Sequence, residues 1–245
     1  MIKKRYFTVG EKILWCASVL VITASFLIFD REGWLTLAAS LIGVTSLIFN
    51  AKGNPLGPIL IIVFSAFYGY ISYTFKYYGE MITYLGMSAP MAVLALIQWL
   101  KNPYHGNRAQ VEIRNLKKNE VIFMLVLSVA VTAVFYFILD ALNTANMFPS
   151  TISVTTSFLA VYLTYKRSEY YALAYAANDV VLIVLWTMAT LQNTAYLSVV
   201  ICFAVFLVND LYGFVNWRKM KKTQEKRKER GEGTGEEWKK RKDKI

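Results

Sequence analysis

The sequence contains few of the residues on which catalytic and metal sites usually depend. Its 245 residues include one histidine, His105, which lies in a short polar loop. They also include two cysteines, Cys16 and Cys202, each of which lies inside an apolar run. Isolated cysteines in apolar runs behave as small hydrophobic side chains, and neither has a spaced partner for metal or redox chemistry. The chain also has no HExxH motif and no glycine-rich phosphate loop. These absences argue against an enzyme, and we expect no catalytic residue, no metal and no cofactor.

Charged residues are also scarce, at 18% of the chain. A soluble domain carries about one-quarter charged residues, spread along its length. Here the charges are nearly absent from long stretches, and 56% of the residues are hydrophobic. This distribution argues against a soluble globular enzyme, a disordered chain and a disulfide scaffold. It predicts an all-α polytopic membrane protein.

Eight apolar segments reach or approach the length of about 20 residues that a membrane-crossing helix needs. These segments are 13–29, 34–50, 55–75, 81–100, 119–140, 148–165, 170–191 and 194–217. Most gaps between them are short, so neighbouring helices must run antiparallel. Pro90 lies inside the fourth segment and should kink it. The run after Lys3-Lys4-Arg5 offers no small-x-small cleavage site, so we expect a retained helix rather than a signal peptide.

The basic residues are divided very unequally between the two sides of the membrane. With eight crossings, both termini lie on one side, and that side holds 25 of the 27 lysines and arginines. Only Arg31 and Lys76 fall on the other side. Because loops rich in lysine and arginine stay in the cytoplasm, we expect a multi-pass protein of the cell membrane (inner or plasma) with cytoplasmic N- and C-termini.

Two short stretches occur twice at inner helix ends. Ser46–Lys52 loosely resembles Ala160–Lys166, and Gln98–Lys101 resembles Asn216–Lys219, with offsets of 114 and 118 residues. The two matching pairs of stretches predict two copies of a block of three helices, at about 34–101 and 148–219. Because three is odd, a tandem copy would be inverted, and one linking helix between the copies restores the same orientation. Transporters are known with such parallel repeats and with substrate held near the midplane; chance matches between helix-end anchors are the alternative.

This organisation divides the chain into five parts. They are an N-terminal segment with the first helix (1–33), repeat 1 (34–101), a cytoplasmic loop with the linking helix (102–147), repeat 2 (148–219) and a basic cytoplasmic tail (220–245). Of the lysines and arginines, 13 lie in the last 28 residues, mixed with six acidic residues. We expect a flexible tail, with some helix up to Arg230, that is attracted to anionic membrane lipid. Apart from charge, nothing supports a nucleic-acid partner.

Polar residues at membrane depth are concentrated in the second repeat. The segment 170–191 contains Asn178-Asp179 and, two turns later, Trp186; the segment 194–217 contains Asn209-Asp210. No lysine or arginine lies in the predicted helices of either repeat, so the aspartates require an aqueous cavity or a cationic ligand. Trp186 offers an aromatic face for a flat, positively charged ring. The alternative for the two asparagines is hydrogen bonding between helices.

Other polar and aromatic residues of the repeat helices are weaker candidates. In the first repeat these are Ser65, Tyr68, Tyr84, Gln98 and Trp99, and in the second they include Tyr212 and Trp217. Tryptophans near helix ends often serve only as anchors at the membrane interface, and this is the alternative for Trp99 and Trp217.

At these residues the chain resembles the PnuC-type vitamin transporters. The likeness spans about residues 30–219 and is carried by three segments. They are Asn178-Asp-Val-Val-Leu-Ile-Val-Leu-Trp186, Asn209-Asp-Leu-Tyr-Gly-Phe-Val-Asn-Trp217, and Tyr68-Gly-Tyr-Ile-Ser-Tyr73 with Tyr78-Gly-Glu80. The resemblance implies a SWEET-like 3+1+3 fold. It also implies facilitated diffusion without ATP or a driving ion, with the vitamin trapped inside the cell by phosphorylation.

The resemblance also implies a substrate and residues that bind it. The substrate expected is nicotinamide riboside, with thiamine or riboflavin as alternatives within the family. Asn178, Trp186 and Asn209 are expected to bind it, with Tyr212. Many relatives have a Tyr-Gly-Trp-type sequence where this chain has Leu96-Ile-Gln-Trp99, which leaves the role of Gln98 open. Two questions also stay open: whether the protein is a non-transporting scaffold or sensor instead, and whether it forms a homo-oligomer.

Overall fold

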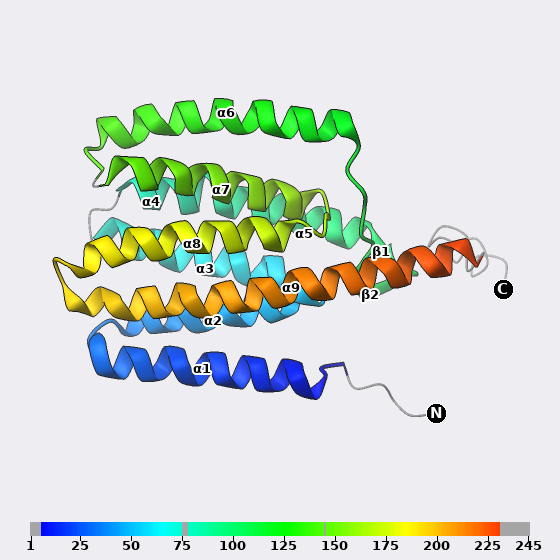
Figure 1. The fold of residues 1–245 in the computed structure, drawn as a ribbon, viewed down its shortest axis with the longest axis horizontal. Helices are drawn as coiled ribbons and strands as arrows, with labels where there is room; N and C mark the ends of the chain where they lie inside the picture. Colours follow the sequence, from blue (N-terminus) through cyan, green and yellow to red (C-terminus); the bar gives the residue numbers. More distant parts are fainter. Residues whose placement is uncertain (1–5, 75–77, 145, 231–245) are drawn as a thin grey trace.

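Eight helical stretches are long and apolar enough to cross a membrane, as the sequence predicts, within the residues that the computed structural model describes: 6–74, 78–144 and 146–230. The helices are α1 (Val9–Phe29), α2 (Trp34–Ala51), α3 (Leu56–Thr74), α4 (Tyr78–Ile82), α5 (Ala89–Lys101), α6 (Lys118–Ala141), α7 (Met147–Tyr165), α8 (Tyr171–Thr190) and α9 (Leu197–Glu229). The helix α1 begins and α9 ends at the same end of the bundle, here called the termini end (Figure 1). The opposite end is the loop end.

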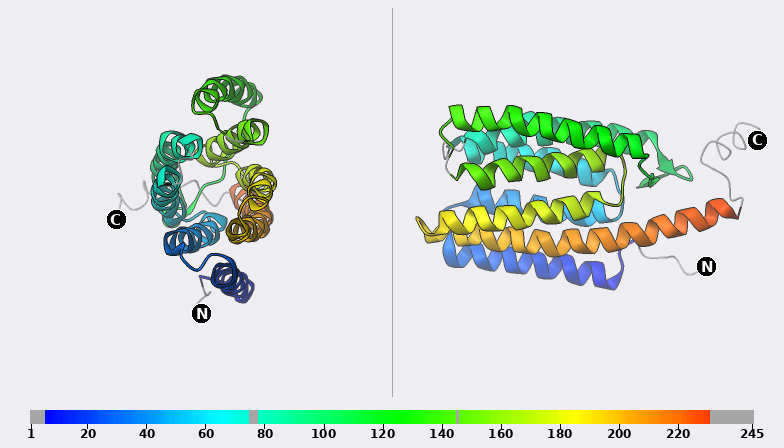
Figure 2. Two further views of the ribbon diagram at one scale, coloured as in Figure 1. Left: turned by 90° about the vertical axis from the view of Figure 1, so that its left-hand side faces the viewer. Right: turned by 45° about the horizontal axis from the view of Figure 1, so that its top comes forward.

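Seen along the bundle axis, the helices form two rows (Figure 2). The helices α2, α3 and α5 make one row, and α7, α8 and α9 make the other. The rows meet where α2 packs on α9 and where α5 packs on α7. The helix α1 packs on α2 and α9, and α6 packs on α7, so both lie outside the rows.

The fourth span departs from regular α-helix in its middle. It consists of α4, a π-helical turn (Thr83–Ser88) and α5. In the π turn the N–H of Ala89 donates to the carbonyl of Tyr84, five residues earlier. A π turn commonly causes a bend, and this one directly precedes Pro90. The irregularity expected at Pro90 therefore takes the form of a π turn on its N-terminal side.

The same turn follows α2 and α7, the first helix of each row. Gly53 and Arg167 both adopt left-handed backbone conformations, with φ of 65° and 59°. In both turns the next N–H bonds back across the turn over 3.0 Å, from Asn54 to the Phe49 carbonyl and from Ser168 to the Leu163 carbonyl. This is the geometry of a Schellman C-cap. The two turns are 114 residues apart, which is the offset of the sequence repeat.

The helices outside the rows make matching ion pairs at the termini end. Glu11, in the first turn of α1, lies 3.0 Å from the Lys52 ammonium group at the end of α2. Glu120, in the first turn of α6, lies 3.3 Å from the Lys166 ammonium group at the end of α7. The two ion pairs are thus formed alike by α1 and α6, the helices that lie outside the three-helix blocks expected from the sequence.

At the termini end a β-hairpin joins the two rows. It is formed by β1 (Pro103–Tyr104) and β2 (Asn107–Val111). The N–H of Val111 donates to the Gly53 carbonyl over 2.9 Å, and Gln224 on α9 bonds the Ile113 N–H and the Val111 carbonyl. The tail is helical to Glu229, in agreement with the prediction of helix up to Arg230. Its first turns are held by these bonds rather than flexible, and residues 231–245 lie outside the described residues.

Candidate functional site

A cavity lies between the two rows, near the middle of the bundle. Every span of both rows contributes residues to its lining. The lining residues are Gly43, Ser46, Leu47, Ile61, Phe64, Tyr84, Ser88, Ser157, Val161, Tyr175, Asn178, Asp179, Leu182, Phe203, Phe206 and Asp210. We call this space the central cavity.

Two buried carboxyl groups give the central cavity its acidic character. Asp179 on α8 and Asp210 on α9 are 4% and 3% exposed, and their side chains lie close enough to interact directly. The Oδ2 atom of Asp179 has no hydrogen-bond partner among the described residues. No lysine or arginine belongs to the described lining. Because buried carboxylates need a counter-charge or water, the cavity is suited to a cation.

Asn178 is held in a fixed orientation by α7. Its Oδ1 accepts hydrogen bonds from the hydroxyls of Thr156 and Ser157, over 2.8 and 3.0 Å. With the carbonyl oxygen occupied on that side, the amide NH2 of this cavity-lining residue is the group that remains to donate to a ligand.

A second pocket opens at the loop end, and Trp186 lines it. The pocket encloses about 790 Å³, part of it open to the surroundings. Its lining residues are Tyr78, Gly79, Glu80, Leu142, Asn143, Thr144, Asn146, Ser150, Leu185, Trp186, Ala189 and Gln192. The Trp186 ring lies 5.3 Å from the Tyr196 ring. Trp186 is two turns from Asn178 along α8, about 12 Å, so the two residues belong to different pockets.

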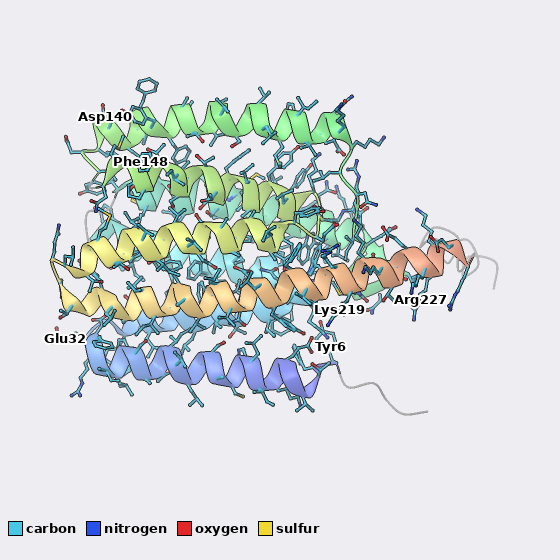
Figure 3. All side chains as sticks on the ribbon, in the orientation of Figure 1. Tyr6, Glu32, Asp140, Phe148, Lys219 and Arg227 are labelled. Carbon is cyan, nitrogen blue, oxygen red and sulfur yellow. The ribbon has the colours of Figure 1, made fainter. Side chains whose placement is uncertain are left out.

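A smaller pocket of about 400 Å³ connects the lining of these two spaces. It shares Glu80 and Leu185 with the loop-end pocket, and Tyr84 and Ser157 with the central cavity. The pockets thus follow one another from the loop end, where Glu32 and Asp140 lie, toward the middle of the bundle (Figure 3).

A pair of buried tryptophans lies on the termini side of the central cavity. A further pocket there reaches Asn50 and Thr164, the residues to which Trp217 and Trp99 donate. The indole N–H of Trp99 donates to the Thr164 carbonyl over 3.0 Å, and that of Trp217 donates to the Asn50 carbonyl over 2.8 Å. The two rings lie 5.5 Å apart. At 1% and 0% exposure these residues are not membrane-interface anchors, so that alternative is wrong.

Two of the predicted substrate-binding residues face α1 instead of the central cavity. The amide NH2 of Asn209 donates to the Ser18 hydroxyl over 2.9 Å. The hydroxyl of Tyr212 donates to Glu11 Oε1 over 2.8 Å. Both residues therefore join α9 to the helix outside the rows.

Of the first-repeat candidates, Tyr84 lines the central cavity, whereas Tyr68 and Gln98 do not. Tyr68 is buried, with its ring 4.7 Å from that of Tyr84, which lines the cavity. Gln98 is half-buried near the termini end, where it interacts with Asn102. The structure thus brings together Asn178, Asp179 and Asp210.

Tyr175 and Glu80 are among the pocket-lining residues that sequence analysis did not identify as site residues. Tyr175 lines the central cavity one turn before Asp179, and this i, i+4 spacing on α8 is a signal that identifies it. Glu80 lines the loop-end pocket, and its signal is an acidic residue directly before the apolar segment 81–100.

Comparisons with known proteins agree on one family. The sequence model described as nicotinamide mononucleotide transporter matches residues 33–219. A Neisseria mucosa protein named nicotinamide riboside transporter PnuC is 28% identical over 214 residues, covering 85% of this chain and 81% of that protein. A Haemophilus influenzae protein of the same name is 20% identical over 223 residues, covering 89% and 96%. The crystal structure of the vitamin B3 transporter PnuC matches with a TM-score of 0.77 and 25% identity, covering 89% of this chain and 94% of that one.

Proposed function

Because the chain belongs to the nicotinamide mononucleotide transporter family, we propose that it carries nicotinamide riboside across the cell membrane by facilitated diffusion. It is a multi-pass membrane transporter and not an enzyme, as its relatives are transporters. The observation that carries the choice of substrate is the acidic central cavity, which has no lysine or arginine in its described lining.

The charge of the cavity favours the riboside over the mononucleotide. The riboside carries one positive charge on its pyridinium ring, which the carboxyl groups of Asp179 and Asp210 attract. The mononucleotide adds a phosphate, for which the described lining offers no charge-assisted partner. Thiamine is also a cation and fits the charge argument, whereas riboflavin is neutral. The printed names of the two relatives support the riboside.

The roles of the lining residues follow from their positions. Asp179 and Asp210 provide the negative charge in the middle of the membrane, and the amide of Asn178 donates a hydrogen bond to the substrate. Trp186 stacks on the pyridinium ring at the loop end. Tyr68 supports Tyr84 from behind. Asn209 and Tyr212 act as positioning residues that join α9 to α1.

The termini end of the bundle is proposed to be cytoplasmic. Of the described lysines and arginines, only Arg31 lies in a loop at the loop end, and the others cluster at the termini end. Substrate then enters from outside through the loop-end pocket, and the tryptophan pair closes the cytoplasmic side. Transport proceeds as uniport, with flux set by the gradient and maintained by phosphorylation of the vitamin inside the cell.

The two halves of the chain are proposed to be parallel copies. The matched turns after α2 and α7, the reciprocal indole bonds and the paired Glu11–Lys52 and Glu120–Lys166 contacts support this. Alternating access is then a movement of one row against the other around the central cavity.

Uptake of labelled nicotinamide riboside into proteoliposomes tests the function. We expect saturable uptake that follows the substrate gradient and needs neither ATP nor an ion gradient. A scaffold or sensor gives no uptake above empty liposomes, and an enzyme gives a chemically changed product. Uptake that requires an imposed ion gradient contradicts the uniport mechanism but not the choice of substrate.

A further inference from the structure

The loop-end pocket combines an aromatic wall with a carboxyl group. Trp186 and Tyr78 supply the aromatic rings, Asn143 and Gln192 supply amides, and Glu80 supplies a carboxyl group. No lysine or arginine belongs to its described lining. An aromatic face next to a carboxylate is a common arrangement for binding an organic cation.

The carboxyl group of Glu80 forms no ion pair with a lysine or arginine among the described residues. Its Oε2 atom is enclosed and has no hydrogen-bond partner among the described residues. The described ion pairs occupy other acidic residues, namely Glu11, Glu120 and Glu169. An enclosed carboxylate at membrane depth is costly unless a cation or water meets it. This second observation distinguishes Glu80 from an ordinary surface carboxylate.

We propose that the loop-end pocket is a separate outer site, in which Glu80 and Trp186 hold an organic cation before it reaches the central cavity. This inference rests on the proposed transport function and adds a specificity-determining residue to it. The connecting pocket includes Glu80 at one side and Tyr84 at the other, so the outer site and the central cavity are neighbours along the path. A cation thus leaves one carboxylate and meets the Asp179–Asp210 pair next.

The outer site selects for charge rather than for ribose. Glu80→Gln keeps the shape of the side chain and removes only its charge, so it separates attraction from packing. The matched control is Glu32→Gln, which makes the same charge change at an exposed position in the α1–α2 loop, outside the pocket lining. At 0.15 M salt, screening over about 8 Å limits the influence of such a surface charge.

The first test compares uptake of nicotinamide riboside with uptake of its reduced, uncharged dihydropyridine form. We expect Glu80→Gln to raise the KM for the charged riboside about tenfold and to leave the maximal rate and the KM for the uncharged form within about twofold. Glu80→Asp restores part of the lost affinity, and Glu32→Gln changes neither KM. An equal loss for both substrates, or no change for either, overturns the outer site.

A second test separates the outer site from the proposed function. Binding of 1-methylnicotinamide, a pyridinium cation without ribose, is compared with binding of neutral nicotinamide to the purified protein and to Glu80→Gln. We expect the wild type to prefer the cation, and Glu80→Gln to lose that preference. If the wild type prefers the cation and Glu80→Gln loses this preference, the outer site is supported. If the same wild type does not transport the riboside, the proposed function alone is contradicted. Equal binding of both probes by the wild type overturns the outer site even if the riboside is transported.

Discussion

The loop end and the termini end of the bundle differ in the pockets that lie between the two rows. At the loop end, pockets of about 790 and 400 Å³ lead inward past Glu80 and Trp186. At the termini end, a pocket of about 240 Å³ stops at the residues bonded by Trp99 and Trp217. The described pockets thus run inward from the loop end and reach the buried pair of Trp99 and Trp217 at the termini end, which we call the tryptophan seal. The difference shows which contacts must break before a substrate can leave through the termini end.

The seal depends on bonds between the rows rather than within them. Trp99 on α5 donates to α7, and Trp217 on α9 donates to α2. Tyr171 adds a ring contact to Trp217 at 4.7 Å. A hydrogen bond contributes about 1 kcal/mol net, so two of them can be broken and remade during transport. Contacts of this strength can stabilise the conformation seen here and still break when the protein changes conformation.

The largest effect is expected from removing one side of the seal. Trp217→Ala empties a fully buried site, and such changes cost about 3–5 kcal/mol of unfolding free energy. Trp34→Ala is the matched control, because Trp34 is 63% exposed at the loop end. Thermal unfolding of the purified variants checks this. Equal losses of melting temperature for the two variants would mean that the seal is no better packed than the exposed surface.

Shortening α9 should weaken the termini end by a smaller amount. Truncation after Met220 removes Gln224, which bonds Ile113 and Val111, and Lys221, which pairs with Glu169. We expect a loss of about 2 kcal/mol. Truncation after Arg230 keeps these contacts and is the control. Melting temperatures that coincide for both truncations would contradict the bridging role of the hairpin.

A substitution between the two ends should change affinity more than stability. Asp179→Asn removes one negative charge from the central cavity, and we expect the Kd for nicotinamide riboside to rise about tenfold. Asp140→Asn, on exposed α6 at the loop end, is the control with the same chemistry. Equilibrium binding to the purified proteins measures both. If the two variants bind equally well, the cavity carboxylates do not meet the substrate.

The smallest effect is expected at the contact between α9 and α1. Tyr212→Phe removes the hydrogen bond to Glu11 and should cost about 1 kcal/mol of stability while the Kd stays unchanged. Tyr136→Phe, on the exposed face of α6, is the control. A higher Kd with unchanged stability would instead make Tyr212 a substrate-binding residue.

The sequence predicts the helices well because each span is defined locally by its length and apolar composition. The turns after α2 and α7 could also be paired from sequence, since Lys52 and Lys166 end similar stretches. The face that each polar residue presents could not be predicted. Asn209 and Asp210 are neighbours in sequence, yet Asn209 bonds α1 and Asp210 lines the cavity.

The tryptophan seal could not be predicted either. A tryptophan near a helix end is typical of a membrane interface, and only the packing of the two rows buries Trp99 and Trp217. The bonds that they make span 65 and 167 residues of sequence. Local sequence carries no information about partners at such distances.

The central claim is that an acidic cavity without basic residues selects the riboside. Titration calorimetry of the purified protein with nicotinamide riboside and with its mononucleotide tests it most directly, because the two ligands differ only in the phosphate. The account predicts saturable binding of the riboside and no measurable binding of the mononucleotide at concentrations that saturate with the riboside. Equal affinity for both ligands would contradict it, because a phosphate would then have a basic partner along the path.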